Sequence, residues 1–386
     1  MSTQSTAYIG ASIFDGHKMH EGCALVVHDK TIGGVVAASK LPSDVRQIPL
    51  EGGTLIPGYV DLQVNGGGGV MFNDAPTIET LQTMARAHAG LGATSVLPTL
   101  ISDTPSQVQS AVAAVEAAIS GNVAGIIGLH LEGPHLSQSR KGAHDPSLIR
   151  PMEADDEAFL LKAAAMLPLL KVTIAPESVS LKQIKRLSKA GILLSLGHSD
   201  ASYDTCMKAA QNGVRCVTHI FNAMSQLGNR EPGMVGAALS CADLSAGLIA
   251  DLIHVHPNTI ATALRAKNGP GQVFLVSDAM ATAGSNIDHF FLNGRRIERG
   301  EFRLTLPDNT LAGADLDLTT AIRNIMQTTT LSLAQAVAMA TSIPAELVGL
   351  GGEIGHLTPD SRADFLHITE NKLVSVWQSG TRIAGK

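Results

Sequence analysis

The sequence predicts an α/β fold: a (β/α)8 barrel of the TIM type with a small β-sandwich domain formed from both chain termini. From about residue 56, short apolar runs alternate with helix-like stretches in eight successive units, which indicates a parallel sheet closed into a barrel. The length of 386 residues suits one barrel and an accessory domain. The two ends differ from the middle, because they contain short β-like pieces separated by turns.

The first element in chain order is the β-like segment 1–55, which includes "EGCALVVHDKTIGGVV". Segment 353–386 has the same character, and its "TENK" is a predicted hairpin turn between "ADFLHI" and "LVSVWQ". Each end alone is too short to bury a core. We therefore expect 1–55 and 353–386 to pair into one small β-domain, with the barrel spanning 56–352.

The barrel strands are predicted from apolar runs, because strands buried on both faces of a parallel sheet are continuously apolar. In chain order they are "YVDLQV", "TSVLPTLI", "AGIIGLHLE", "LLKVTIAPE", "ILLSLGHS", "CVTHIFNA", "AGLIADLIHV" and "QVFLVSDA".

Helices are predicted between most of these strands. In "IETLQTMARAHAGLGA", for example, Leu81, Met84 and His88 recur at helical spacing. Several helices should end at a glycine, as a C-cap requires, and the candidates are Gly92, Gly191 and Gly213. The segment from about 284 to 312 is predicted to be a β-like insertion after the eighth strand.

The composition excludes several classes of function. The net charge of −6 without basic runs, and only 3% aromatic residues, argue against a nucleic-acid surface. No stretch is apolar enough to cross a bilayer, and the N-terminus lacks the pattern of a signal peptide. The four cysteines form no C-x-x-C pair, as expected in a reducing compartment. We therefore expect a cytoplasmic protein with a small-molecule substrate.

Three polar side chains at predicted strand ends form a candidate metal site. Function in such a barrel collects where the strands end, and Glu132, His198 and His219 lie at the ends of strands three, five and six. One such residue alone would more often be structural. Three protein ligands with one open position are the arrangement of a catalytic zinc site, so together they indicate a metal-dependent hydrolase.

Asp278, at the end of strand eight, is the candidate general acid/base. No other titratable residue occurs in its apolar run, and a carboxylate there can take a proton from water and return it to a leaving nitrogen. The structural alternative is a helix N-cap. Other polar residues suit a substrate better. Arg230, in "GNREPG", can bind a phosphate or be a solvated loop residue, and His144 and His254 are equally ambiguous.

The first barrel strand carries an unusual pair. Metal-dependent hydrolases of this kind usually have His-x-His at this strand end, whereas here the two positions are Gln63 and Asn65. Neutral amides are poor ligands for transition metals. The pair therefore indicates either an inactive site or an active site with one metal fewer.

Several motifs together resemble the N-acetylglucosamine-6-phosphate deacetylase family of the amidohydrolase superfamily. The resemblance runs in order from about residue 51 to 365. It rests on "PGYVDLQVNG", "HLEGPHLS", "LGHSDA", "THIFNAMSQLGNREPG", "IADLIHVH", "LVSDAMATAG" and "LAGADLDL". Within this family, the Gln-x-Asn pair resembles the single-metal branch. His135 and Leu252 depart from the family pattern and are expected to alter the shape of the pocket.

The resemblance implies a role for each matching residue. Glu132, His198 and His219 would hold one divalent ion per subunit, with Zn2+ expected and Fe2+, Co2+ or Mn2+ as alternatives. Asp278 would be the acid/base, and His144 would polarise the acetyl carbonyl. The implied substrate-binding residues are Gln63, Ala143, Asn222, Ala223, Arg230, His254, Leu311, Ala312 and Gly313.

The implied reaction is hydrolysis of N-acetyl-D-glucosamine 6-phosphate to D-glucosamine 6-phosphate and acetate. A homodimer is also implied, with Arg230 reaching the neighbouring active site. The alternatives are deacetylation of the galacto epimer, or a non-catalytic protein that binds sugar phosphates. Ring-opening amidohydrolase activity is disfavoured, because no lysine lies near the end of strand four and Lys171 is at the opposite end of its run.

Overall fold

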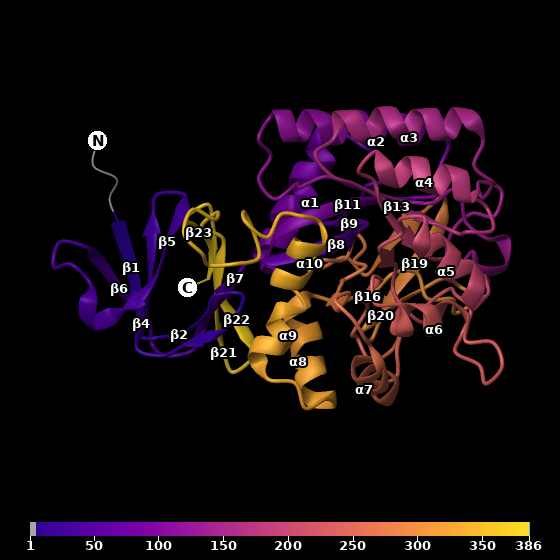
Figure 1. The fold of residues 1–386 in the computed structure, drawn as a ribbon. Helices are drawn as coiled ribbons and strands as arrows, with labels where there is room; N and C mark the ends of the chain where they lie inside the picture. Colours follow the sequence, from indigo (N-terminus) through magenta and orange to yellow (C-terminus); the bar gives the residue numbers. More distant parts are fainter. Residues whose placement is uncertain (1–4, 386) are drawn as a thin grey trace.

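The computed structural model describes residues 5–385 and contains a parallel eight-stranded barrel surrounded by helices, with β-sheets from both chain ends beside it (Figure 1). The predicted fold class is confirmed. The barrel strands pair in chain order, each parallel to the next. They are β8 (Tyr59–Val64), β11 (Ala93–Ile101), β12 (Leu129–Glu132), β13 (Leu170–Ile174), β14 (Leu193–Leu196), β15 (Cys216–Val217), β16 (Ser245–Leu248) and β17 (Val273–Leu275).

The barrel closes between its first strand and the residues that follow its last. Val64 and Ala279 form a parallel bridge. The Asp278 N–H donates to the Gln63 carbonyl at 3.1 Å, and the Asn65 N–H donates to the Ala279 carbonyl at 2.8 Å. These bonds bring Gln63 and Asn65 beside Asp278.

The helices lie around the barrel between successive strands. Thr77, Thr104 and Ser180 cap the helices that follow them, each accepting a backbone N–H with its side chain. The helices are α1 (Ile78–Gly90), α2 (Pro105–Ser120), α3 (Ala154–Met166), α4 (Leu181–Lys189), α5 (Tyr203–Gln211), α6 (Gly233–Ser240), α7 (Pro257–Ala266), α8 (Leu318–Thr328), α9 (Leu333–Ala338) and α10 (Ser342–Leu347), with short 3-10 turns η1 (Ala38–Lys40) and η2 (Gln138–Arg140). Within residues 5–385, no helix is both long and apolar enough to span a bilayer.

Two sheets flank the barrel on the side where both termini lie (Figure 1). The four-stranded sheet has the order β5-β4-β1-β6, and the six-stranded sheet has the order β23-β22-β21-β7-β2-β3, so it combines strands from both chain ends. The aromatic rings of Tyr8, Phe365 and Trp377 pack together between them. The strands are β1 (Ser5–Ile9), β2 (Ser12–Phe14), β3 (Met19–His20), β4 (Cys23–His28), β5 (Thr31–Ala37), β6 (Arg46–Pro49), β7 (Thr54–Pro57), β21 (Phe365–Thr369), β22 (Lys372–Gln378) and β23 (Thr381–Gly385).

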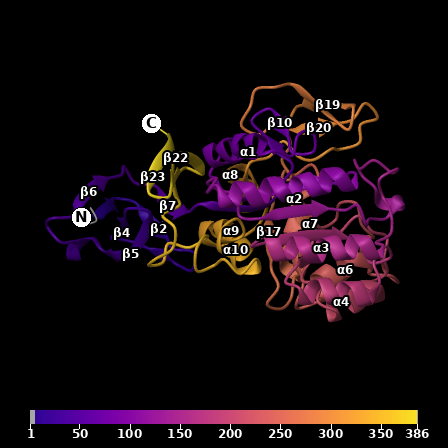
Figure 2. The same ribbon diagram turned by 90° about the horizontal axis from the view of Figure 1, so that it is seen from above.

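A three-stranded antiparallel sheet follows the last barrel strand, within the segment predicted to be a β-like insertion. It consists of β18 (His289–Leu292), β19 (Arg295–Gly300) and β20 (Arg303–Thr305). Figure 2 shows β19 and β20 beside β10 (Val70–Met71), which pairs with β9 (Gly66–Gly67). Leu292, Ile297 and Leu304 pack against Met71 and Met280, so the insertion has a small core of its own above the barrel.

Candidate active site

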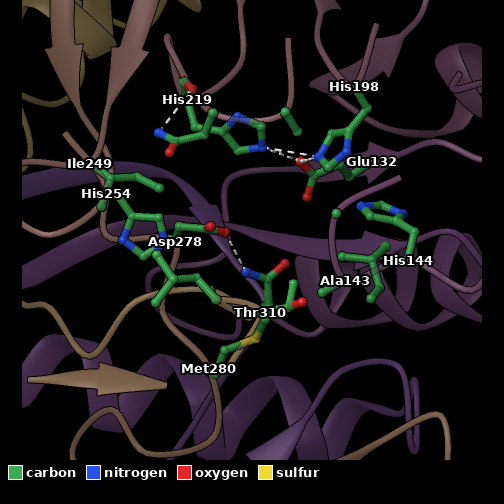
Figure 3. Close-up of a pocket in the computed structure, with 17 residues that line it drawn as sticks. Glu132, Ala143, His144, His198, His219, Ile249, His254, Asp278, Met280 and Thr310 are labelled. Atoms are coloured by element: carbon green, nitrogen blue, oxygen red, sulfur yellow. Dashed lines mark hydrogen bonds and ion pairs between the residues drawn. The ribbon is translucent and has the colours of Figure 1, made fainter. Parts of the chain in front are cut away.

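The side chains of Glu132, His198 and His219 converge at the carboxyl ends of β12, β14 and β15 (Figure 3). Nε2 of His219 lies 3.1 Å from Nε2 of His198 and 3.1 Å from Oε1 of Glu132, and Nε2 of His198 lies 3.3 Å from the same oxygen. Two ligands about 2.0–2.1 Å from a tetrahedral ion are roughly 3.3 Å apart. The three atoms are therefore spaced as ligands of one metal ion.

A backbone hydrogen bond orients His198 for a metal. His198 donates from Nδ1 to the Arg140 carbonyl at 2.9 Å, which leaves the Nε2 lone pair facing Glu132 and His219. Burial raises the pKa of Glu132, but its contacts with His198 and His219 outweigh burial and hold it well below the usual range. A carboxylate and two imidazoles are a donor set that fits a divalent transition ion.

The backbone adopts an unusual conformation at two of the candidate ligands and at Asp278. His198, His219 and Asp278 have φ values of 47°, 27° and 50°, in the left-handed region that is uncommon for residues with a Cβ. Each lies two or three residues after the end of its strand. Such backbone strain clusters at functional sites, and here it accompanies the turn of the side chains into the barrel mouth. His219 therefore lies two residues beyond β15, whereas the run "CVTHIFNA" predicts a longer strand that contains it.

Asp278 is held by the two amides of the first barrel strand. Its Oδ1 accepts hydrogen bonds from Nδ2 of Asn65 at 2.7 Å and from Nε2 of Gln63 at 3.1 Å. Gln63 also donates to both carboxylate oxygens of Glu132, at 3.2 and 3.3 Å. Burial and the nearby Glu132 raise the pKa of Asp278, whereas the bond from Asn65 lowers it. Gln63 and Asn65 therefore act here as hydrogen-bond donors to carboxylates.

The ring of His144 faces the same cavity and has a defined tautomer. The Ser102 N–H donates to Nδ1 of His144 at 3.3 Å, and the Ser102 hydroxyl lies 2.8 Å from the same nitrogen. With Nδ1 accepting, the proton of a neutral imidazole is on Nε2. Burial and the nearby His198 lower the pKa of His144 to about 3. His144 is thus a neutral ring with an N–H available to a substrate oxygen.

His254 is oriented by a neighbour on the same loop. Its Nδ1 lies 2.6 Å from Oδ2 of Asp251, while Oδ1 of Asp251 accepts the backbone N–H groups of Ile253 and His254. Burial raises the pKa of Asp251, but the bond to His254 and the backbone N–H bonds outweigh it, and the pKa is lowered. An ionised Asp251 therefore keeps the Nδ1 proton in place and directs Nε2 toward the cavity.

These groups surround one cavity of about 250 Å³. Of the residues predicted from sequence, the cavity brings together the three candidate ligands and Asp278, His144, His254, Ala143, Asn222, Ala223, Leu311 and Gly313. Sequence reasoning gave no role to five further lining residues, namely Ile101, Gly142, Ile249, Met280 and Thr310. Four of them lie in or beside predicted motifs: Gly142 in "KGAHDP", Ile249 in "IADLIHVH", Met280 in "LVSDAMATAG" and Thr310 next to Leu311. Ile101 ends an apolar run and has no distinctive local pattern.

Three predicted residues lie outside the lining. Gln63 is buried beneath the carboxylates, and Ala312 is fully buried in the core of the insertion. Arg230 is exposed in the loop before α6 and lies away from the cavity of its own chain. This location is compatible with the predicted reach into a neighbouring subunit, which stays a prediction.

The two departures from the family pattern also lie outside this cavity. The Nδ1 atom of His135 contacts the Arg150 carbonyl at 3.2 Å, and its side chain lines a separate cavity between α2 and α3. Leu252 has a φ of 68°, in the left-handed region that favours glycine. Neither residue lines the cavity, and their effect on its shape stays a prediction. Lys171 is fully buried within the barrel, with Nζ 3.4 Å from the Leu62 carbonyl.

Comparisons with known proteins cover nearly the whole chain. The chain matches the amidohydrolase family model over residues 54–385 and the NagA composite domain model over residues 7–55. It is 40% identical to an N-acetylgalactosamine-6-phosphate deacetylase of Shewanella sp. (strain ANA-3), over 96% of this chain and 94% of the relative. It is 32% identical to an N-acetylglucosamine-6-phosphate deacetylase of Haemophilus influenzae, over 98% of both.

A solved structure has the same fold. The crystal structure of N-acetylglucosamine-6-phosphate deacetylase from Pasteurella multocida superposes with a TM-score of 0.93 at 30% sequence identity. The superposition covers 97% of this chain and 98% of the other.

Proposed function

We propose that this chain, which belongs to the amidohydrolase family and is a hydrolytic deacetylase, acts on N-acetyl-D-glucosamine 6-phosphate. The products are then D-glucosamine 6-phosphate and acetate. The observation that carries this proposal is the convergence of a candidate metal site, a buried carboxylate and a neutral imidazole on one cavity.

A divalent metal ion is implied by the family, and Glu132, His198 and His219 are its proposed ligands. We infer one ion per subunit, because the amides of Gln63 and Asn65 occupy the positions where a second ion would need imidazoles. Zn2+ suits the donor set best, with Fe2+, Co2+ and Mn2+ as the alternatives. When bound, the ion supplies Lewis acidity, which makes water a better nucleophile and the acetyl carbonyl a better electrophile.

The chain's own groups move the protons. Asp278, hydrogen-bonded to Asn65, accepts a proton from the attacking water and afterwards gives it to the departing amine nitrogen. Burial favours the protonated carboxyl that the second step requires. The Nε2–H of His144 donates to the acetyl oxygen as negative charge develops on it. A neutral imidazole is a very weak acid, so His144 stabilises this charge through a hydrogen bond and keeps its own proton.

The remaining cavity residues position the sugar phosphate. We infer that His254 and the partner's copy of Arg230 bind the phosphate, which makes the active form a homodimer. Asn222 and Ala223 contact the sugar, while Ala143, Leu311 and Gly313 close over it. Gln63 holds the two carboxylates in place. We also propose a cytoplasmic location, where sugar phosphates are formed and consumed.

The Shewanella relative favours a second candidate substrate, N-acetylgalactosamine 6-phosphate. The two sugars differ only in the configuration of one hydroxyl group, at C4. Both carry the same acetamide and phosphate, so the proposed chemistry applies unchanged to either.

Acetate release from three sugars tests the proposed function. Metal-loaded protein should hydrolyse N-acetylglucosamine 6-phosphate fastest. The kcat/KM for unphosphorylated N-acetylglucosamine should be lower by about 10-fold to 100-fold or more. The reason is that each lost hydrogen bond to the charged phosphate contributes about 1.5–3 kcal/mol. Preference for the galacto epimer would replace the first candidate by the second. Failure to release acetate from all three sugars would contradict the proposal.

Asn65→Ala tests the role assigned to Asp278. The variant loses a 2.7 Å hydrogen bond that favours ionised Asp278, so the pKa of Asp278 should rise further. Such a bond to a charged group contributes about 1.5–3 kcal/mol to stabilising the ionised form. Because Asp278 must be ionised to accept a proton, the acidic limb of the kcat/KM profile should move to higher pH. Asn212→Ala, at the half-buried residue that follows α5, should leave the limb unchanged. An unchanged limb in Asn65→Ala would contradict the assignment.

A further inference from the structure

A second group of side chains that could ligate a metal lies outside the catalytic cavity, where the terminal sheets meet the barrel. His17 belongs to the turn between β2 and β3, Glu346 to helix α10, and His356 to the segment after α10. One ligand atom from each of the three lies within 4.8 Å of the other two. Figures 1 and 2 show α10 on the side of the barrel that faces these sheets.

The spacing of these atoms resembles that of the first site. Nε2 of His356 lies 3.3 Å from Oε1 of Glu346. Charge-assisted hydrogen bonds between nitrogen and carboxylate oxygen are usually about 2.7–2.9 Å long, whereas two ligands of a tetrahedral zinc are roughly 3.3 Å apart. The ring of His17 lies 4.4 Å from that of His356, centroid to centroid. A third donor is therefore close to the pair.

The imidazole of His356 is poorly satisfied by the protein alone. The residue is only 3% exposed, and its Nδ1 has no hydrogen-bond partner among residues 5–385. Gly16, at φ +102°, passes so close to this ring that an added Cβ would lie 2.4 Å from Nδ1. Because Gly16 covers Nδ1, Nε2 is the nitrogen of this buried ring that faces Glu346 and is available to an ion.

The segments that carry His17 and His356 are held together without an ion. Oδ1 of Asp15 accepts the backbone N–H groups of His17 and Lys18, both at 2.8 Å. The Leu357 N–H donates to the Asp15 carbonyl at 2.8 Å, which links the β2–β3 turn to the residue after His356. The group is thus preorganised, so ion binding would not carry the entropic cost of ordering a loop.

We propose that His17, Glu346 and His356 bind a second divalent ion, of the zinc type, that joins the terminal sheets to the barrel. Two imidazoles and one carboxylate favour Zn2+ or a similar transition ion over Mg2+ and Ca2+, which prefer oxygen ligands. His17 and Glu346 are exposed, so the ion enters from solvent and keeps water in its remaining position. The role is structural, because the group lies outside the catalytic cavity.

The experiment compares the zinc content of the full-length protein and three variants after dialysis against one zinc buffer. His17→Ala and Glu346→Gln change exposed ligands and should each bind one zinc fewer than wild type. His28→Ala, which removes an exposed histidine from β4, should bind as much as wild type. Deacetylase activity should be the same in all four proteins.

Thermal unfolding provides the second measurement. Zinc should raise the unfolding midpoint of wild type more than that of His17→Ala, because an ion that binds only the folded state stabilises it. Equal zinc content in wild type, His17→Ala and Glu346→Gln, with equal shifts in midpoint, would overturn the proposal. Zinc content and midpoint are each compared between variant and wild type, and the catalytic site is the same in all of these proteins. The result therefore does not depend on how many ions the catalytic site holds.

Discussion

Asp278→Asn should reduce kcat by about 10²-fold to 10⁴-fold, the usual contribution of a general acid or base. The substituted amide has nearly the same shape as the carboxyl group and remains within reach of Asn65 and Gln63. It cannot accept a proton from water at neutral pH. Substrate affinity should change little, because the loss concerns the chemical step rather than the contacts to the sugar and the phosphate.

Single-turnover acetate release and substrate binding, measured on the same preparation, check this expectation. Asp204→Asn is a matched control, because it makes the same chemical change at an exposed position in the first turn of α5. The control should retain wild-type activity. Turnover of Asp278→Asn within a few-fold of wild type would mean that another group performs the proton transfer.

His219→Ala should remove the catalytic ion and with it almost all activity. The substitution leaves two of the three proposed ligands, and the buried carboxylate of Glu132 loses the closer of its two imidazole contacts. Because a catalytic metal supplies several kcal/mol of transition-state stabilisation, kcat should fall by about 10³-fold or more. The metal content should fall by one equivalent relative to wild type.

Metal analysis and acetate release on the same sample check this second expectation. His367→Ala is the matched control, since His367 is an equally buried histidine, 6% exposed, in strand β21 of the terminal sheets. It should keep its full metal content. A His219→Ala protein that retains both metal and activity would exclude His219 as a ligand.

The strands that position the site could be predicted because their apolar runs are unambiguous. The run "YVDLQV" is strand β8, Tyr59–Val64, without any difference in its bounds. The run "TSVLPTLI" matches β11 to within one residue. The six runs after it predict strands that are too long, and "CVTHIFNA" contains only the two-residue strand β15. The chain leaves the sheet there because His219 adopts a left-handed conformation, which no pattern of apolar residues reveals.

The candidate ligands and Asp278 could be found from their positions at strand ends, but the contacts that prepare them could not. Ser102 determines the tautomer of His144 from another strand end, 42 residues earlier in the chain. Asn65 was identified as part of a motif, but its bond to Asp278 depends on barrel closure. Hydrogen bonds of this kind connect residues that are distant in sequence, so they become visible only in the folded chain.

Product analysis with and without metal is the most direct test of the central claim, a metal-dependent hydrolysis of the sugar acetamide. Wild-type protein should convert N-acetylglucosamine 6-phosphate into equal amounts of acetate and glucosamine 6-phosphate. A chelator should stop this conversion, and added zinc should restore it. Unequal amounts of the two products, or undiminished conversion by fully metal-depleted protein, would contradict the claim.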